Sequence, residues 1–175
     1  MIFSSKAEYG VRLMVELGRQ DQGQPVSLKA IAAAENLPLA YLEQVVARLK
    51  KAELVRSARG AHGGYWLARP AEEITMDEVV LALEGAIAPM ECFVNEQTER
   101  VLCSHLEHAG ADHTCATKLL WMRVQGGVVR SLQTTSLAEL VEFSRRENQL
   151  RAGAAPSPGA PLQVAAPAAP ASPAA

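Results

Sequence analysis

The feature that most constrains the fold is a run of two short helix patterns and a glycine-rich hairpin between residues 27 and 67. Ser27 is expected to cap a first helix over residues 28–36, because serine is a favourable N-cap. Leu37-Pro38 interrupts the pattern, and a second helix is expected over residues 39–52, since proline is tolerated in a first helical turn. Two helices joined by a tight turn predict a helix-turn-helix.

A hairpin is predicted directly after the second helix. Residues 54–59 have the pattern of an outgoing strand and residues 65–68 that of a returning strand. The segment between them, Gly60-Ala61-His62-Gly63-Gly64, has the composition of a hairpin turn. A hairpin that follows a helix-turn-helix is a wing, so residues 1–84 are expected to form a winged helix-turn-helix DNA-binding domain.

Helix patterns dominate the rest of the chain, and the predicted fold class is mainly α with a small β-hairpin wing. An amphipathic helix is expected over residues 4–20, opened by a capping box of Ser5 and Glu8. The other predicted helices cover residues 75–83, 116–132 and 136–148. The segment 85–115 has weak periodicity, so a loop is expected there. Residues 151–175 are mostly Ala, Pro, Ser and Gly, which predicts a disordered tail.

The second helix of the pair carries the candidate base-reading residues, because in a helix-turn-helix its first turns reach the major groove. This predicts that Ala40, Tyr41, Glu43 and Gln44 lie at the groove. Gln44 can form a bidentate pair with adenine, and Glu43 can accept a hydrogen bond from cytosine. Ser27, at the start of the first helix, is a further DNA-binding candidate. The alternative is a helical pair with an ordinary surface.

Basic residues cluster in the same region. Between residues 40 and 70, six basic residues stand against two acidic ones, a local charge of +4 in a chain of net charge −2. Arg48, Lys50 and Lys51 suit phosphate contacts, which supply affinity rather than specificity. Arg59 at the wing tip suits a narrow minor groove. A solvated basic helix is the alternative explanation of this charge.

These motifs together resemble the IscR/NsrR/RirA-type family of winged-helix transcription regulators. The resemblance extends over about residues 1–148. It is carried by Tyr41-Leu42-Glu43-Gln44, by Leu54-Val55 and by Arg59-Gly60-x-x-Gly63-Gly64-Tyr65-x-Leu67. The resemblance implies a homodimer that binds a pseudo-palindromic operator, with the helix over residues 116–132 as the dimerisation helix. It also implies groove-facing roles for Tyr41, Glu43 and Gln44 and a wing role for Arg59.

Three cysteines, Cys92, Cys103 and Cys115, lie in or directly after the predicted loop. Thiolates are the usual ligands of iron–sulfur clusters. Zinc is the alternative, with a histidine completing a tetrahedral site; the candidates are His105, His108 and His113. A single cysteine is more often a small buried apolar residue.

The resemblance favours the cluster, because many family members hold one with three cysteines in this loop. The cysteines here are further apart than in the best-known members, so [2Fe-2S] and [4Fe-4S] both stay open. In some relatives the residue at the position of Glu8 reaches the cluster across the dimer, which makes Glu8 a candidate fourth ligand.

The sequence therefore predicts a dimeric transcriptional repressor that senses redox state, iron or nitric oxide through an iron–sulfur cluster. One alternative is a regulator with zinc, a thiol switch or a small-molecule effector; another is a metal- or cluster-binding protein without DNA binding. No nucleophile–base constellation or phosphate loop is evident, so an enzyme is not expected. A cytoplasmic protein without membrane association is expected, because the sequence has neither a signal-peptide pattern nor an apolar run of about 20 residues.

Overall fold

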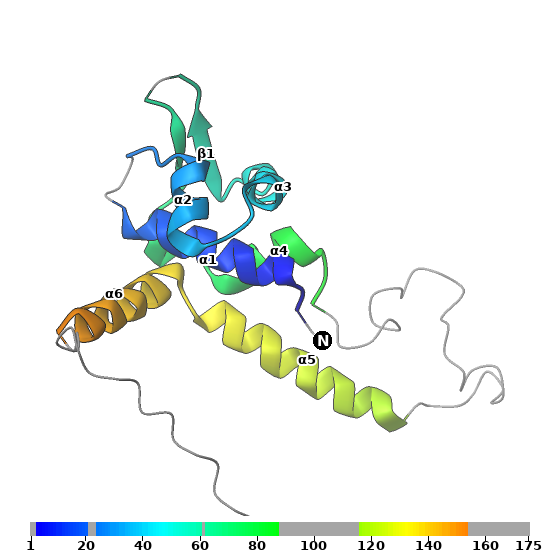
Figure 1. Ribbon diagram of the computed structural model, residues 1–175. Helices are drawn as coiled ribbons and strands as arrows, with labels where there is room; N and C mark the ends of the chain where they lie inside the picture. The colour runs from blue at the N-terminus through cyan, green and yellow to red at the C-terminus, as the bar shows by residue number, and fades with distance from the viewer. Residues whose placement is uncertain (1–2, 21–23, 61, 88–115, 154–175) are drawn as a thin grey trace, which may run out of the picture.

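The computed structural model describes residues 3–20, 24–60, 62–87 and 116–153 (Figure 1). These residues form six α-helices, one 3₁₀ turn and one antiparallel hairpin. In chain order the elements are α1 (Ser5–Arg19), α2 (Leu28–Glu35), α3 (Leu39–Lys51), β1 (Val55–Ala58), β2 (Gly64–Leu67), η1 (Ala71–Glu73), α4 (Met76–Glu84), α5 (Ala116–Thr134) and α6 (Leu137–Gly153). The predicted fold class, mainly α with a small β-hairpin wing, is confirmed.

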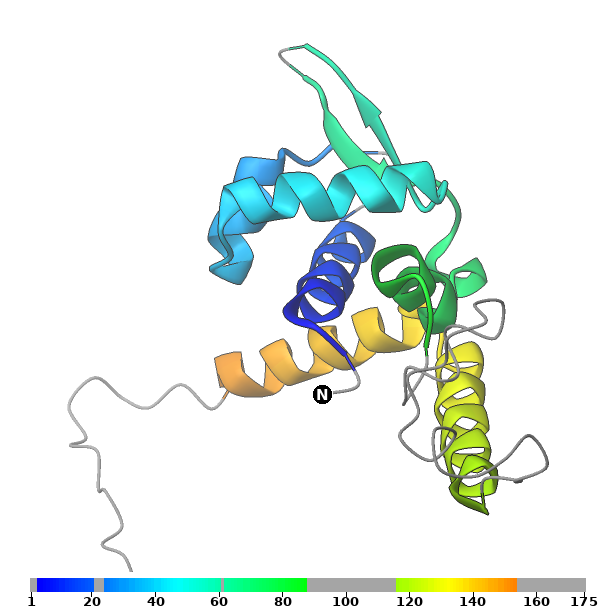
Figure 2. The ribbon, with the colours of Figure 1, turned by 90° about the vertical axis from the view of Figure 1, so that its right-hand side faces the viewer.

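Helix α1 is the centre of the fold. It contacts α3, α4 and α6, and it lies between α3 and α6 in Figure 2. Leu13, Met14 and Leu17 are buried on the side that faces these helices, as expected for apolar residues at helical spacing. Among the described residues, the core contains no fully buried polar or charged side chain. The fold therefore rests mainly on apolar burial.

The residue that caps the N-terminus of α1 differs from the predicted one. The cap is Ser4 rather than Ser5, and its hydroxyl oxygen accepts a hydrogen bond from Lys6 N at 3.2 Å. Ser4 also donates through N and Oγ to Glu84 Oε1, at 3.1 and 2.5 Å. The predicted capping box of Ser5 and Glu8 is wrong, because the partner that orients this end lies in α4. Glu8 is exposed on the surface of α1.

Glu84 joins α4 to the beginning of α1. Burial raises the pKa of its carboxyl group, but the hydrogen bonds from Ser4 and the positive charge of Lys6 lower it by more, so the net effect is a lowered pKa. The ionised form of Glu84 is consequently the form that the folded chain favours.

The hairpin is attached to the helix-turn-helix at its base. Register runs from Val55 opposite Leu67 to Ala58 opposite Gly64. The segment before α2 adds a short bridge, with Val26 N donating to Tyr65 O at 2.9 Å and Tyr65 N donating to Val26 O at 2.8 Å. A Cβ on Gly64 would lie 2.6 Å from the Val26 carbonyl oxygen. Glycine at this position therefore permits the close approach of the two segments.

Helix α4 begins with a capping box formed by Thr75 and Glu78. Helix α6 packs on α1 and continues to Gly153, beyond the predicted end near Asn148. Helix α5 packs on α4 and extends away from the remaining helices (Figure 1). No helix in the described part of the chain is both long and apolar enough to cross a membrane.

Candidate nucleic-acid interface

Helix α3 has one apolar and one polar face. Its apolar face is buried in the core and consists of Leu42, Val45, Val46 and Leu49. On the opposite face Ala40, Glu43 and Gln44 are exposed. The buried face orients the helix and leaves the polar face outward. In Figure 2 the hairpin projects beyond α3, on the side away from α1.

Tyr41 lies between these two faces and is half-buried. Its ring meets the ring of Tyr9 edge to face, with centroids 5.4 Å apart and planes at 82°. This is a favourable geometry for an aromatic pair. Tyr41 therefore attaches the first turn of α3 to α1. It also neighbours the residues that are predicted to face the major groove of DNA.

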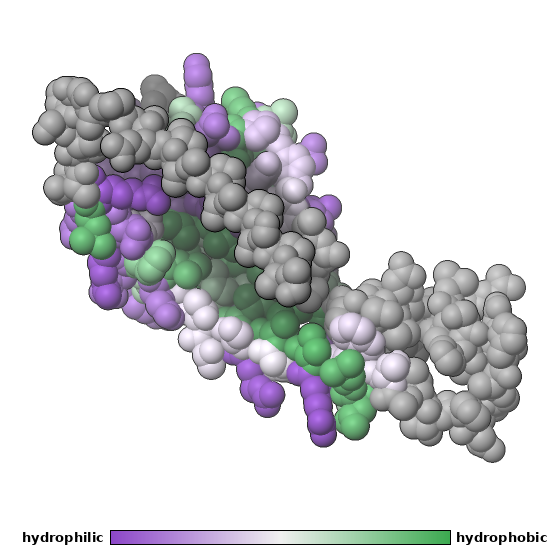
Figure 3. All heavy atoms as spheres, turned by 60° about the horizontal axis from the view of Figure 1, so that its bottom comes forward, coloured by the Kyte–Doolittle hydropathy of each residue, from purple (hydrophilic) through white to green (hydrophobic). Residues whose placement is uncertain are grey.

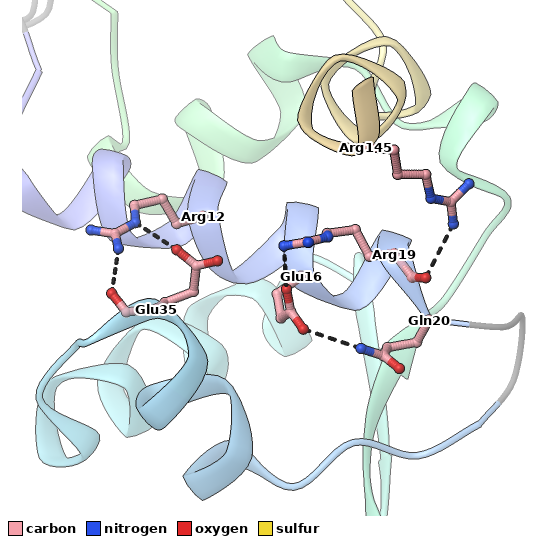
Figure 4. A network of polar contacts seen from close by, with 6 residues as sticks. All are labelled: Arg12, Glu16, Arg19, Gln20, Glu35 and Arg145. Atoms are coloured by element: carbon pink, nitrogen blue, oxygen red, sulfur yellow. Dashed lines mark hydrogen bonds and ion pairs between the residues drawn. The ribbon is translucent and has the colours of Figure 1, made fainter. Parts of the chain in front are cut away.

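Helix α2 is tied to α1 by Arg12. The guanidinium donates through Nε to Glu35 Oε2 at 2.9 Å, and it also donates to the Glu35 carbonyl oxygen at the C-terminal end of α2 (Figure 4). A cation at a helix C-terminus is also favourable for the helix dipole. At the other end of α2, Ser27 is exposed and its Oγ accepts from Ala30 N at 3.1 Å, which confirms the predicted cap.

The wing presents Arg59 immediately after β1, and this residue is exposed. Gly60 follows with φ +116°, a backbone conformation that glycine adopts easily. Arg59 therefore lies at the start of the turn that joins β1 to β2. Its exposed side chain is available to a ligand at the wing.

Two of the basic side chains predicted to contact phosphates have partners within the chain. Arg48 Nη1 donates to the Leu83 carbonyl oxygen at 3.4 Å, and Lys50 Nζ donates to Ser57 Oγ at 2.7 Å. Arg48 thus contacts the end of α4, and Lys50 contacts the first strand of the wing. Sequence reasoning missed both contacts because the partners belong to other elements.

A second surface, on α5 and α6, has the opposite character. Large apolar side chains are exposed there: Leu119, Leu120 and Met122 on α5, and Phe143 and Leu150 on α6. Figure 3 shows hydrophobic side chains gathered in a hollow between more hydrophilic rims on this side of the molecule. Large exposed apolar surfaces of this kind usually mark an interface.

The candidate metal ligands fall mostly outside the described residues. This is the case for Cys92, Cys103 and Cys115 and for His105, His108 and His113. Glu8 is described: it is exposed, and within the described residues its carboxylate has no hydrogen-bond partner. The described part of the chain contains no group of three or more His, Cys, Asp or Glu side chains placed to hold a metal ion.

Comparison with known proteins decides the family. The family model Rrf2, described as an iron-dependent transcriptional regulator, matches residues 3–143. The chain belongs to the Rrf2 family. This finding confirms the resemblance inferred from the residues of α3 and the wing.

Among relatives, the transcriptional regulator CymR of Bacillus subtilis (strain 168) is 35% identical over 149 residues, which cover 85% of this chain and 96% of CymR. The regulator IscR of Photorhabdus laumondii is 34% identical over 141 residues, or 81% of this chain and 79% of IscR.

A solved structure of the B. subtilis CymR, the global cysteine regulator, matches with a TM-score of 0.65 over 82% of this chain and 98% of that chain, at 35% identity. The oxidised form of Staphylococcus aureus CymR matches with a TM-score of 0.61 at 36% identity, over 81% of this chain and 97% of that one. The winged-helix fold and a role as a DNA-binding transcriptional regulator of the Rrf2 family follow. An enzymatic role does not fit a family of transcriptional regulators.

Proposed function

We propose that this Rrf2-family regulator is a homodimeric repressor that binds operator DNA through α3 and the wing and senses iron or redox state through an iron–sulfur cluster. The observation that carries the DNA-binding part is the orientation of α3. Its apolar side is buried in the core. Glu43 and Gln44 are exposed, and neither side chain forms a hydrogen bond or ion pair within the described residues, so both are available to read bases. Arg59 supplies a separate contact from the wing.

The dimer is proposed from the exposed apolar side chains of α5. Leu120 is 55% exposed and Leu119 57% exposed in the protomer, and covering them with a second copy would remove this surface from water. Gly126 and Gly127, in the middle of α5, have open space where a Cβ would lie. A neighbouring helix could approach α5 closely at these glycines.

The cluster is proposed from the donor set of this chain. Three cysteine thiols suit iron–sulfur chemistry, and the family model is described as iron-dependent. Cys92, Cys103 and Cys115 would hold the cluster, and exposed Glu8 is the proposed fourth ligand. When bound, such a cluster supplies reversible redox chemistry. Neither [2Fe-2S] nor [4Fe-4S] is favoured by the residues.

Gln125 of α5 contacts the described chain just before the cysteine segment. Its Nε2 donates to the Ile87 carbonyl oxygen at 2.8 Å, and Ile87 is the last described residue before that segment. A rearrangement of the segment would therefore move α5. In the proposed dimer, a movement of α5 would change the distance between the two α3 helices. Two-state arrangements of this kind are the ordinary basis of ligand-controlled DNA binding.

Anaerobic purification of the full chain tests the cofactor. We expect a coloured protein with visible absorption, iron and acid-labile sulfide, and we expect Cys92→Ala to lose them. Glu8→Gln serves as the matched test of the fourth ligand, with partial loss or faster loss of iron expected. A colourless protein that contains stoichiometric zinc would contradict the cluster.

A thiol switch is the second candidate, favoured by the similarity to CymR, for which an oxidised form has been crystallised. It predicts a metal-free protein whose DNA affinity changes on treatment with peroxide and recovers with a thiol reductant. The same Cys92→Ala variant would then lose the response without any change in metal content.

A further inference from the structure

A groove lies beside the C-terminal end of α1, and it shares no lining residue with the surfaces described above. It has a volume of about 670 Å³ and is bounded by the last turn of α1, by β2 and η1 at the base of the wing, and by α6. Ligand sites of small molecules commonly occupy a few hundred to about 1,000 Å³. The groove is therefore large enough for a small organic molecule.

The lining combines an apolar floor with an aromatic side chain. Leu17 of α1 and Val141 of α6 are buried, and Leu67 of β2 is half-buried beside them. Trp66 is also half-buried and lines the groove from β2. Within the described residues no hydrogen bond is made by its indole N–H. Such a ring favours a flat or apolar ligand group.

Arg145 provides a positive charge at this groove. Its Nη2 donates to the Arg19 carbonyl oxygen at 3.1 Å, which holds the guanidinium over the end of α1 beside Gln20 (Figure 4). No carboxylate of the described residues forms an ion pair with Arg145. The remaining N–H groups of its guanidinium are therefore available to an external acceptor.

The other charged side chains of the lining differ in this respect. Arg69 is paired with Glu78 at 2.8 Å, and Glu142 is paired with Arg146. Glu72, on η1, is exposed and has no ion-pair partner in the described part of the chain. Among the described residues of the lining, Arg145 is consequently the cation without an ion-pair partner, and Glu72 is the anion without one.

We propose that this groove binds a small organic carboxylate with an apolar body, an activity that goes beyond DNA binding and beyond the proposed cluster. The carboxylate would accept hydrogen bonds from Arg145, which is the strongest polar recognition that the groove offers. The apolar body would pack against Trp66 and the floor formed by Leu17 and Val141. Because Trp66 and Leu67 belong to β2, an occupant would contact the base of the wing directly.

Phenylacetate is a suitable probe, and the full-length Trp121→Phe variant leaves Trp66 as the reporter of binding. We expect a saturable change in Trp66 emission with a dissociation constant of about 1 mM, the affinity typical of a ligand of this size. Phenylacetamide has the same shape without the charge, and we expect it to bind at least about tenfold more weakly. Binding is measured without DNA, so that failure here leaves the proposed DNA-binding function untouched.

Arg145→Gln is expected to weaken phenylacetate binding by about tenfold or more. Arg151→Gln, further along the same helix and outside the lining, is the matched control and is expected to bind phenylacetate normally. Circular dichroism of both variants checks the fold. Equal binding of phenylacetate and phenylacetamide, or binding that is unaffected by Arg145→Gln, would overturn the proposal without relying on any variant that fails to fold.

L-Phenylalanine separates two sources of the carboxylate. Its ammonium group would meet Glu72, whereas a simple carboxylate would be repelled by that residue. Tighter binding of L-phenylalanine, reduced by Glu72→Gln, assigns the groove to amino acids. Tighter binding of phenylacetate, increased by the same variant, assigns it to simple carboxylates.

Discussion

The surface formed by α3 and the wing contrasts with the surface formed by α5 and α6. On α3 the apolar face of Leu42, Val45, Val46 and Leu49 is buried and most of the exposed residues are polar, so the core beneath this helix is formed within one chain. On α5 and α6 large apolar side chains remain exposed, with Phe143 at 64% and Leu150 at 66%. The first surface is therefore suited to a hydrated, charged partner such as DNA, and the second to a partner that excludes water.

Because the two surfaces differ in this way, the stability of the protomer and the association of two protomers can be tested separately. A substitution beneath α3 is expected to affect folding of the protomer, whereas a substitution on α5 is expected to affect association.

Leu49→Ala is expected to have the largest effect, a loss of about 3 kcal/mol in the free energy of unfolding. Leu49 is 0% exposed, and its removal leaves a cavity beneath the C-terminal half of α3. Urea unfolding followed by circular dichroism measures the change. Leu39→Ala is the control, since Leu39 is 38% exposed on the same helix. Similar losses of unfolding free energy in the two variants would show that α3 does not bury Leu49 in the core as described.

Leu120→Asp tests the other surface. We expect dimerisation to weaken by about 100-fold, because the substitution places a charge in an interface that excludes water. Analytical ultracentrifugation over a concentration series measures the dissociation constant. Gln133→Asp adds the same charge at an exposed polar position of α5 and is expected to have little effect. A monomeric wild-type chain would refute the proposed role of α5.

The sequence predicted the first surface better than the second for a physical reason. The apolar residues of α3 recur with the helical period, so Leu42, Val45, Val46 and Leu49 could be assigned to the core from their spacing alone. The caps at Ser27 and Thr75 were also predictable, because their partners lie within a few residues.

Long-range contacts could not be read in this way. The cap at Ser4 depends on Glu84, and the contacts of Arg48 and Lys50 depend on Leu83 and Ser57. No local pattern predicts such distant partners, and for this reason the predicted cap at Ser5 is wrong. The predicted base-reading residues stay predictions, and the cysteine ligands lie outside the described residues.

Arg59→Ala sharpens the assignment of the wing to DNA. We expect about tenfold weaker binding to an operator selected from random duplexes, and a slope of log affinity against log salt that is smaller by about one. Fluorescence anisotropy at several salt concentrations provides both values. Arg146→Ala, on α6 at a distance in sequence and fold from the wing, is the control. An unchanged affinity for Arg59→Ala would remove the wing from the DNA interface.

Glu84→Gln is expected to have the smallest effect, a loss of about 1 kcal/mol near neutral pH. The folded-state pKa of Glu84 is lowered relative to its ordinary value of 4.5. Its ionised form therefore stabilises the fold above that value, and this stabilisation disappears as the pH falls through the folded-state pKa. Urea unfolding at pH 7 and below about pH 4 should show the difference between wild type and variant shrinking in acid. A difference that is independent of pH would contradict the role given to the Ser4–Glu84 contact, and Glu43→Gln is the control on an exposed carboxylate.

The most direct test of the whole account is the operator affinity of one anaerobic preparation, measured by anisotropy before and after removal of its iron. The dimeric fraction is measured in both states. We expect iron to be present and its removal to change operator affinity by about tenfold or more, which corresponds to a coupling free energy within the usual range. Iron-containing and iron-free protein that bind the operator with the same affinity would contradict this expectation.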